Sequence, residues 1–246
     1  MDHKRHIDTF TLTTAETDFM NTWRPSSILE HCQECASRHC EPMGLGRNAL
    51  LSKGMVWVAT AIEARFTRLP HLAESISLET FHRPMRHGLF PRFFVVRENT
   101  SGETLGTLSS LWALMDLDTR KMLPGTEEAR LMPDNSDIPA PAALPSLPRR
   151  LSVSAQLSSY QAVYTDLDNN HHVNNARYLD LCCNALGIAC LRTSYVDSFL
   201  VRYLHEIRPD DQIETCLQTE NNTFFYTGKK EDIPCFEISG TLCPRD

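Results

Sequence analysis

The sequence predicts an α+β protein built from two similar halves, each a helix wrapped by an antiparallel sheet. Three observations predict this fold class. A proline-rich stretch divides the 246 residues near the middle, each half shows one strand, one helix and four further strands, and residues 65–80 resemble residues 202–217 at a constant offset. A half of this size buries a core most simply when its sheet curves around its helix.

The proline-rich stretch spans residues 124–149 and contains six of the fourteen prolines. It has little periodic apolar pattern, which indicates an extended, semi-rigid linker rather than a helix or a strand. We therefore expect two domains, at residues 1–123 and 150–246.

The first half is expected to begin with a strand over residues 6–14. Pro25 suits the first turn of a helix, and Gly44 and Gly46 would end that helix. Alternating or continuous apolar runs then predict four strands. These strands are expected at residues 56–66, 74–81, 91–98 and 104–116.

The second half repeats this order, with a strand expected over 151–165 and a helix over 174–190. Its four further strands are expected at residues 199–207, 212–219, 222–229 and 234–243. In the local match between the halves, Arg65 corresponds to Arg202 and Phe66 to Tyr203. A duplicated unit accounts for both the match and the repeated order of elements.

Composition excludes some classes of function. A formal net charge of −7 argues against a general nucleic-acid or membrane-surface binder. We find no apolar run long enough for a signal peptide or a membrane span, and nine scattered cysteines suggest free thiols in a reducing, cytoplasmic setting. Cys32 and Cys35 form a CxxC pair, but without a second pair we favour structural thiols over a metal site.

Polar residues concentrate in YTDLDNNHHVNN, residues 164–175, between an expected strand and an expected helix. A turn that caps the helix would explain one asparagine but not the whole group. A calcium loop starting at Asp166 fails because His171 stands where a glycine is needed and Arg177 where a glutamate is needed. Adjacent histidines point in different directions, so we expect no zinc here and no cofactor.

A catalytic interpretation uses the position of this segment. The start of a helix presents free backbone amides and a partial positive charge, which suits a carbonyl that becomes an oxyanion; Asn174 and Asn175 lie there. Asp168, Asn170 and His172 alternate, so they would share one side of an extended stretch. They offer a base or nucleophile, an amide donor and an imidazole.

This segment resembles the acyl-acyl-carrier-protein (acyl-ACP) thioesterases, whose pattern is Asp-x-Asn-x-His-Val-Asn-Asn followed by x-x-Tyr. The matching residues are Asp168, Asn170, His172, Val173, Asn174, Asn175 and Tyr178. Residues 79–94 and 109–121 also resemble the family, and its Tyr-x-x-Glu pattern matches Tyr203 and Glu206. The resemblance implies two hot-dog folds in one chain and hydrolysis of fatty acyl-ACP to free fatty acid and holo-ACP.

The two halves differ at the positions that matter for chemistry. The constant offset places Leu69 opposite Glu206, and the segment NTWRPSS before the first helix has neither an acid nor a histidine. We expect the second half to be catalytic and the first to form a wall of the acyl tunnel, as the family resemblance implies. Ile207 stands where plant members have a cysteine, which excludes a Cys–His mechanism there.

The mechanism we expect leaves two roles open. Asp168 either attacks the thioester carbonyl or helps to position water, and Glu206 activates the hydrolytic water. Asn170 and His172 would orient the acids and stabilise charge. Neighbouring acids titrate as a coupled set, so sequence does not assign the roles.

The expected partner is an acyl carrier protein with its phosphopantetheine-linked acyl chain. Basic residues that could meet it, or form an ordinary solvated surface, are Arg83, Arg86, His87, Arg92, Arg149 and Arg150. We expect no nucleic-acid partner and leave a homodimer open. Alternative functions are an acyl-CoA thioesterase of the same fold and a non-catalytic acyl-CoA or acyl-ACP binding protein; a hot-dog dehydratase would need a different His/acid pattern.

Overall fold

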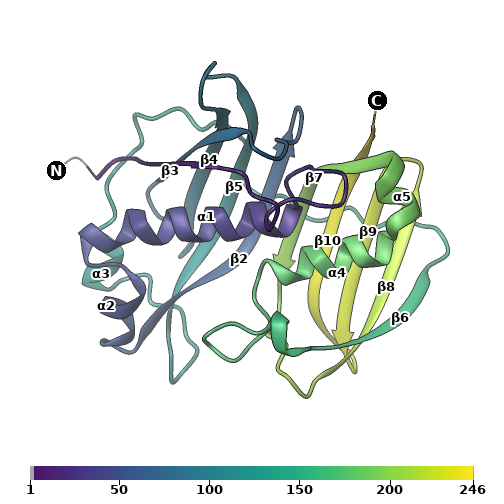
Figure 1. Cartoon of the computed structure of the whole chain (residues 1–246). Helices are drawn as coiled ribbons and strands as arrows, with labels where there is room; N and C mark the ends of the chain where they lie inside the picture. Colours follow the sequence, from purple (N-terminus) through teal and green to yellow (C-terminus); the bar gives the residue numbers. More distant parts are fainter. Residues whose placement is uncertain (1–2, 246) are drawn as a thin grey trace. The chain divides into compact units, whose positions relative to one another are not determined.

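The computed structural model describes residues 3–245 and divides into two compact units (Figure 1). Unit 1 comprises the residues up to Trp23 together with Glu30–Pro145. Unit 2 comprises Arg24–Leu29 together with the residues from Ser146 on. None of the helices in the described part of the chain is both long and apolar enough to cross a membrane.

In unit 1, the antiparallel strand order is β1-β3-β4-β5-β2, and the long helix α1 (Pro25–Cys40), which belongs to this unit from Glu30 on, lies along one face of these strands (Figure 1). The other elements of unit 1 are β1 (His6–Thr11), η1 (Glu41–Met43), α2 (Arg47–Leu51), β2 (Met55–Phe66), β3 (Ser75–His82), β4 (Phe90–Glu98), β5 (Thr104–Asp116) and α3 (Glu127–Arg130). The long helix begins at Pro25 as expected but ends at Cys40. The 3-10 turn η1 follows and ends at Gly44, whose φ of 70° is left-handed.

Unit 2 contains the antiparallel order β7-β10-β9-β8-β6 with α4 and α5 beside it. Its elements are β6 (Gln156–Gln161), η2 (Tyr164–Asp166), α4 (Arg177–Leu186), α5 (Ile188–Thr193), β7 (Ser194–Tyr203), β8 (Gln212–Glu220), β9 (Thr223–Lys230) and β10 (Ile233–Pro244). The expected helix over 174–190 is wrong in its bounds, because Gly187 with a φ of 86° separates α4 from α5. The expected strand over 199–207 also ends early, at Tyr203, so Glu206 lies in the following loop.

The register of strand pairing shows that the two units have the same topology. In unit 1, β1 pairs with β3 from His6↔Thr80 to Thr11↔Ser75. In unit 2, β6 pairs with β8 from Gln156↔Leu217 to Gln161↔Gln212. The two ladders therefore run in the same register over their full length, with one constant offset for each strand. The predicted α+β fold with a duplicated helix-and-sheet unit is confirmed.

Most of the proline-rich stretch packs on unit 1. Asn135 is fully buried, and its Nδ2 donates to the carbonyl oxygens of Lys4 and His82 at 2.9 and 2.8 Å. Ile138 joins a small buried cluster with Phe81 and Phe93. These contacts hold the stretch against the sheet, and the expected domain bounds at 123 and 150 stay a prediction.

Arg92 lies inside unit 1, so its expected place on a carrier-facing surface is wrong. It is 4% exposed. Its Nη1 contacts His39 Nδ1 at 3.0 Å and Thr80 Oγ1 at 3.1 Å, and its Nη2 contacts Cys40 Sγ at 3.2 Å. On β4 it alternates with buried Phe90 and Phe94, which places all three on the inner face.

Two histidines accompany this guanidinium. His39 Nε2 lies 2.8 Å from the His3 carbonyl oxygen. A carbonyl only accepts and arginine only donates, so His39 must be neutral, with its proton on Nε2. The ring of His82 stacks on His39 at 5.5 Å, and both of its buried nitrogens lack a hydrogen-bond partner among residues 3–245. Burial and the nearby Arg92 charge lower the pKa of His39 to about 4 and that of His82 to about 2.

We expect these histidines to make the fold acid-sensitive. Below pH 6.5, their ordinary pKa, the unfolded chain binds protons that folded His39 and His82 do not, so stability falls as pH falls. The limiting slope is about 1.4 kcal/mol per pH unit for each histidine. Urea unfolding between pH 6.5 and 4.5 measures this slope, at pH values above those where protonation of carboxylates dominates the change in stability. His82→Phe should reduce the slope, whereas a change of the exposed His205 to Gln should not; equal slopes would contradict this account.

Candidate active site

Residues 167–173 form a tight turn rather than the extended stretch that the alternation predicted. Leu167 and Val173 form an isolated antiparallel bridge. Asp168 N donates to the His172 carbonyl oxygen at 2.9 Å, and His171 N donates to the Asp168 carbonyl oxygen at 3.0 Å. His171 closes the turn with a left-handed φ of 61° and is exposed. The turn therefore brings Asp168 and His172 together.

The Asp168 carboxylate is occupied by hydrogen bonds within the turn. Oδ1 accepts from the backbone amides of Asn170 at 2.7 Å and His172 at 3.3 Å. Oδ2 accepts from Asn170 Nδ2 at 3.1 Å. Three donors on one carboxylate occupy its lone pairs and make its oxygens poorer nucleophiles.

His172 faces the loop that follows β7. Its Nε2 lies 3.3 Å from Glu206 Oε2, and Val173 N donates to the Ile207 carbonyl oxygen at 2.9 Å, which ties the two loops together. His172 Nδ1 has no protein partner within the described part of the chain. The imidazole thus has a carboxylate on one nitrogen and the other nitrogen available to a proton donor.

Glu206 is held from its other side by Arg208. Glu206 Oε1 accepts from Arg208 Nε at 3.1 Å and from Nη2 at 2.6 Å. Both donors meet the same oxygen, and Oε2 lies toward His172. Arg208 was not among the residues predicted from the sequence. Its position two residues after the predicted acid Glu206 could have indicated it.

The start of α4 is built by the asparagine pair. Asn174 Oδ1 accepts from Ala176 N at 2.8 Å, and the carbonyl oxygen of Asn175 accepts from the Tyr203 hydroxyl at 3.0 Å. The helix therefore begins at Arg177, three residues later than expected. Asn174 acts in the turn before the helix, whose N-cap residue is Ala176 and has no side-chain cap, and oxyanion binding at Asn174 and Asn175 stays a prediction.

Aromatic rings support this helix start from within unit 2. Tyr178, the last residue of the motif, packs edge-on against Tyr203 at 5.4 Å and against Phe236 at 5.0 Å. Burial raises the pKa of the Tyr178 phenol above its ordinary value, so it stays protonated. Tyr178 and Tyr203 thus shape the site without supplying a charge.

The same turn occurs in unit 1, at the corresponding place before α1. Asp18 N donates to the Thr22 carbonyl oxygen at 2.8 Å, and Asp18 Oδ1 accepts from the amides of Met20 and Thr22, both at 2.9 Å. Asn21 has a φ of 60°, and Thr17 bridges Trp23 as Leu167 bridges Val173. An acid is therefore present before the first helix, just upstream of the segment that lacks one. The turn's aspartate is common to both units.

The two units differ in what the turn carries. Thr22 stands at the place of His172, Met20 at that of Asn170, and Leu69 at that of Glu206. Leu69 follows the end of β2 at the same spacing at which Glu206 follows the end of β7. The histidine–glutamate pair is therefore found in unit 2 and not at the corresponding place in unit 1.

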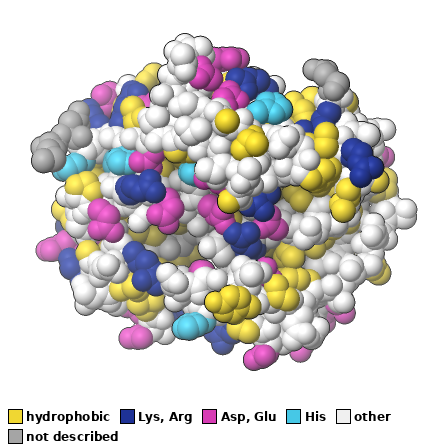
Figure 2. Space-filling view, in the orientation of Figure 1, with side chains coloured by type: hydrophobic (Ala, Val, Ile, Leu, Met, Phe, Trp, Pro, Cys, Tyr) yellow, Lys and Arg dark blue, Asp and Glu magenta, His cyan; other side chains and the backbone are white. Residues whose placement is uncertain are grey.

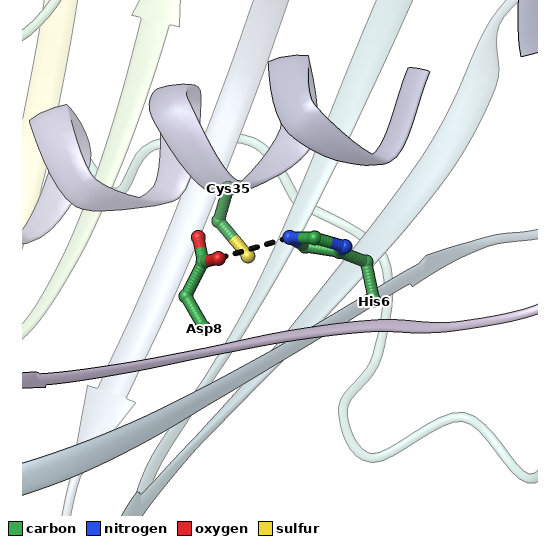
Figure 3. A group of neighbouring side chains, drawn as sticks. All are labelled: His6, Asp8 and Cys35. Atoms are coloured by element: carbon green, nitrogen blue, oxygen red, sulfur yellow. Dashed lines mark hydrogen bonds and ion pairs between the residues drawn. The ribbon is translucent and has the colours of Figure 1, made fainter. Parts of the chain in front are cut away.

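Among the described residues, one group of His, Cys, Asp or Glu side chains is spaced to hold a metal ion, and it lies outside this turn. The group is His6, Asp8 and Cys35 in unit 1 (Figure 3).

Comparison with known families decides the relationship. Residues 3–131 match the acyl-ACP thioesterase N-terminal domain, and residues 151–234 match the acyl-ACP thioesterase C-terminal domain. The chain belongs to the acyl-ACP thioesterase family. This family member is 26% identical over 219 residues to a chloroplastic acyl-[acyl-carrier-protein] hydrolase of Cuphea viscosissima, a match that covers 84% of the chain and 52% of the relative.

A second relative is the chloroplastic palmitoyl-acyl carrier protein thioesterase of Arabidopsis thaliana, 23% identical over 201 residues, with 77% of this chain and 49% of that protein covered. The chain thus spans about half the length of these relatives.

Solved structures share the whole fold. An acyl-ACP thioesterase from Bacteroides thetaiotaomicron superposes with a TM-score of 0.86 at 23% identity, covering 99% of this chain and 100% of that one. A 12:0-ACP thioesterase from Umbellularia californica gives 0.83 at 19% identity, with 98% of each chain covered. The predicted tandem hot-dog fold is confirmed.

Proposed function

We propose that this acyl-ACP thioesterase family member hydrolyses fatty acyl-ACP thioesters to free fatty acid and holo-ACP. The observation that carries the proposal is the pairing of His172 with Glu206 beside the family's Asp-x-Asn-x-His motif, with His172 Nδ1 left available. The names of the relatives point to the same substrate class.

In this mechanism His172 is the base and Glu206 orients it. His172 donates from Nε2 to Glu206, so Nδ1 carries the lone pair that takes a proton from water. The water oxygen attacks the thioester carbonyl, the C–S bond of the tetrahedral intermediate breaks, and the thiolate leaves as holo-ACP. A thiol has a pKa of about 8.5, so the departing sulfur needs little protonation, and the imidazolium can return its proton.

Asp168 and Asn170 act in this scheme by holding the turn. The three hydrogen bonds on the Asp168 carboxylate fix the backbone from which His172 projects. Because the aspartate of unit 1 makes the same backbone bonds without a histidine at the corresponding place, we assign Asp168 positioning rather than attack on the carbonyl.

Arg208 should tune the pair through Glu206. Arg208→Gln removes both hydrogen bonds on Glu206 Oε1 and should disturb the orientation of Oε2 toward His172, so we expect kcat to fall by roughly tenfold while KM changes little. Arg208→Lys should recover part of the loss, because a single ammonium replaces the two guanidinium donors. Steady-state kinetics with both variants tests this. Lys229→Gln removes an exposed pair with Glu214 and serves as the control; equal effects of the two losses would refute a specific role for Arg208.

The carrier-protein surface also belongs to the proposal. Arg86, His87, Arg149 and Arg150 are exposed, although Arg150 also contacts Glu237. On the face drawn in Figure 2, lysines and arginines are interspersed with acidic side chains. A local basic group, rather than a broad positive field, would therefore meet an acidic carrier. A homodimer and a cytoplasmic location stay predictions of the sequence.

The test offers the purified chain a chain-length series of acyl-ACP and acyl-CoA thioesters and follows thiol release. Cleavage of acyl-ACP, lost in His172→Gln and Glu206→Gln, is expected. Faster cleavage of acyl-CoA than of acyl-ACP would show instead that the protein is an acyl-CoA thioesterase. Tight binding of acyl-ACP without any cleavage would replace it by a binding protein.

A further inference from the structure

A second group of chemically reactive side chains lies in unit 1, between β1 and α1. Alternation along β1 turns His6 and Asp8 to the same side, and Cys35 projects from α1 toward both (Figure 3). His6 Nε2 lies 2.9 Å from Asp8 Oδ1, and Cys35 Sγ completes a set of three atoms that all lie within 4.8 Å of one another. The strand β1 and the helix α1 therefore bring a nitrogen, an oxygen and a sulfur atom close together.

We propose that His6, Asp8 and Cys35 form a binding site for a divalent transition-metal ion, with zinc as the ion that suits this donor set. Zinc accepts imidazole nitrogen, carboxylate oxygen and thiolate sulfur at bond lengths of about 2.0–2.3 Å in a tetrahedron, so its ligand atoms stand about 3–4 Å apart. The three atoms need only small side-chain shifts to reach that spacing. Water would fill the fourth position.

The surroundings orient the ligands. Arg38 Nη1 contacts Asp8 Oδ2 at 2.6 Å, which leaves Oδ1 for the ion. The His6 ring stacks on His39 with centroids 6.1 Å apart and planes 16° apart. Cys35 is fully buried on α1, so its side chain is held by the packing around it; its thiol donates to the Leu78 carbonyl oxygen, 3.6 Å away, until that proton is lost when the metal binds. Outer contacts of this kind fix ligand orientation in metal sites.

Binding of a divalent ion at this site balances in charge and in protons. The Cys35 thiol gives one proton to solvent on binding, and neutral His6 moves its proton to Nδ1. The resulting thiolate and the Asp8 carboxylate together neutralise a dication. The Arg38 guanidinium opposes the cation, but the carboxylate lies between them, so we expect moderate rather than very tight affinity.

The site is independent of the proposed hydrolysis. In the copied ladder of unit 2, Gln156 and Ser158 stand at the places of His6 and Asp8. An amide and a hydroxyl are poor zinc ligands, so the group belongs to unit 1 alone. Bound metal would tie the edge strand β1 to α1 and stabilise the fold in proportion to occupancy. In the first half, the sequence suggested a metal only through the Cys32–Cys35 pair, and Cys32 is not part of the group.

Cobalt(II) titration of the chelator-treated, full-length protein tests the site. Cobalt replaces zinc and shows a near-ultraviolet band only when a thiolate binds it. We expect one ion per chain with this band, displaced by zinc, and a rise in Tm with added zinc. Cys35→Ser should abolish the band, and His6→Gln and Asp8→Asn should each weaken affinity at least tenfold. Cys32→Ser, a buried thiol on the same helix, is the matched control and should retain the band.

Absence of the band in the wild-type protein overturns the proposal. So does a band that keeps full affinity in both His6→Gln and Asp8→Asn, because the ion would then lie at another cysteine. These two variants nearly keep the side-chain size, so the result stands even if Cys35→Ser fails to fold.

Discussion

Replacing His172 with glutamine is expected to lower kcat for acyl-ACP hydrolysis by about 10²–10⁴-fold. Glutamine keeps a donor that can reach Glu206 but has no basic nitrogen for the water proton. His172 is partly exposed and its side chain makes no other hydrogen bond or ion pair within residues 3–245, so the free energy of unfolding should change little. Thiol release at saturating substrate and urea unfolding measure the two quantities.

His171 supplies the matched control. It neighbours His172 but is exposed and left-handed at φ 61°, a conformation that asparagine tolerates. His171→Asn should therefore keep both fold and activity. A His172→Gln enzyme with wild-type kcat would remove His172 from the chemistry and leave Glu206 and Asp168 as the candidate bases.

Variants of Glu206 give a second readout. Glu206→Gln removes the orienting carboxylate and should reduce kcat strongly as well. Loss of both groups together should cost little more than the loss of His172 alone, because the two act as one unit.

Much of this arrangement could be predicted from sequence because periodicity and spacing determine it. The β1–β3 and β6–β8 ladders follow the duplicated pattern, and the difference between Leu69 and Glu206 followed from a constant offset. Those features depend on local order along the chain, which the sequence states directly.

The errors come from tertiary context. An alternating Asp-x-Asn-x-His pattern suggested an extended stretch, but the Asp168 side chain competes for backbone amides and folds it into a turn. Arg92 was grouped with the basic residues that could meet a carrier protein, whereas its neighbours Phe90 and Phe94 put that strand face in the core. The residue type of Arg92 suggested an exposed side chain. The alternation of side chains along the strand correctly places Arg92 on the buried face.

The paired aspartates give the second large prediction. Asp18→Ala and Asp168→Ala each remove two backbone hydrogen bonds from the same turn, and each should cost about 1–2 kcal/mol of unfolding free energy. Their effects on activity should differ, because only the turn of unit 2 carries His172. Asp18→Ala is expected to leave kcat near wild type, and Asp168→Ala to lower it by about 10²-fold through displacement of the imidazole.

Asp168→Asn separates positioning from attack. Asparagine can still accept the amides of Asn170 and His172 through Oδ1, and it loses only the bond from Asn170 Nδ2. If Asp168 positions the turn, kcat should fall by roughly tenfold, well short of the loss in His172→Gln. If Asp168 attacks the carbonyl, the two losses should be similar, since an amide oxygen is not a useful nucleophile.

Isotope labelling gives a direct signal for attack by Asp168 without a variant. Under the proposed mechanism, turnover of the wild-type protein in H₂¹⁸O should place the label in the released fatty acid and none in the protein, because water attacks the thioester directly. An acyl-aspartate anhydride that water opens at the Asp168 carbonyl would leave ¹⁸O in the Asp168 carboxylate, detectable in the peptide that contains it, whereas opening at the acyl carbonyl would leave the protein unlabelled, and the Asp168→Asn comparison decides that case. Label in that peptide would make Asp168 the nucleophile and His172 its assisting base. The aspartate would then have a structural role in the turn of unit 1 and a chemical role in the same turn of unit 2.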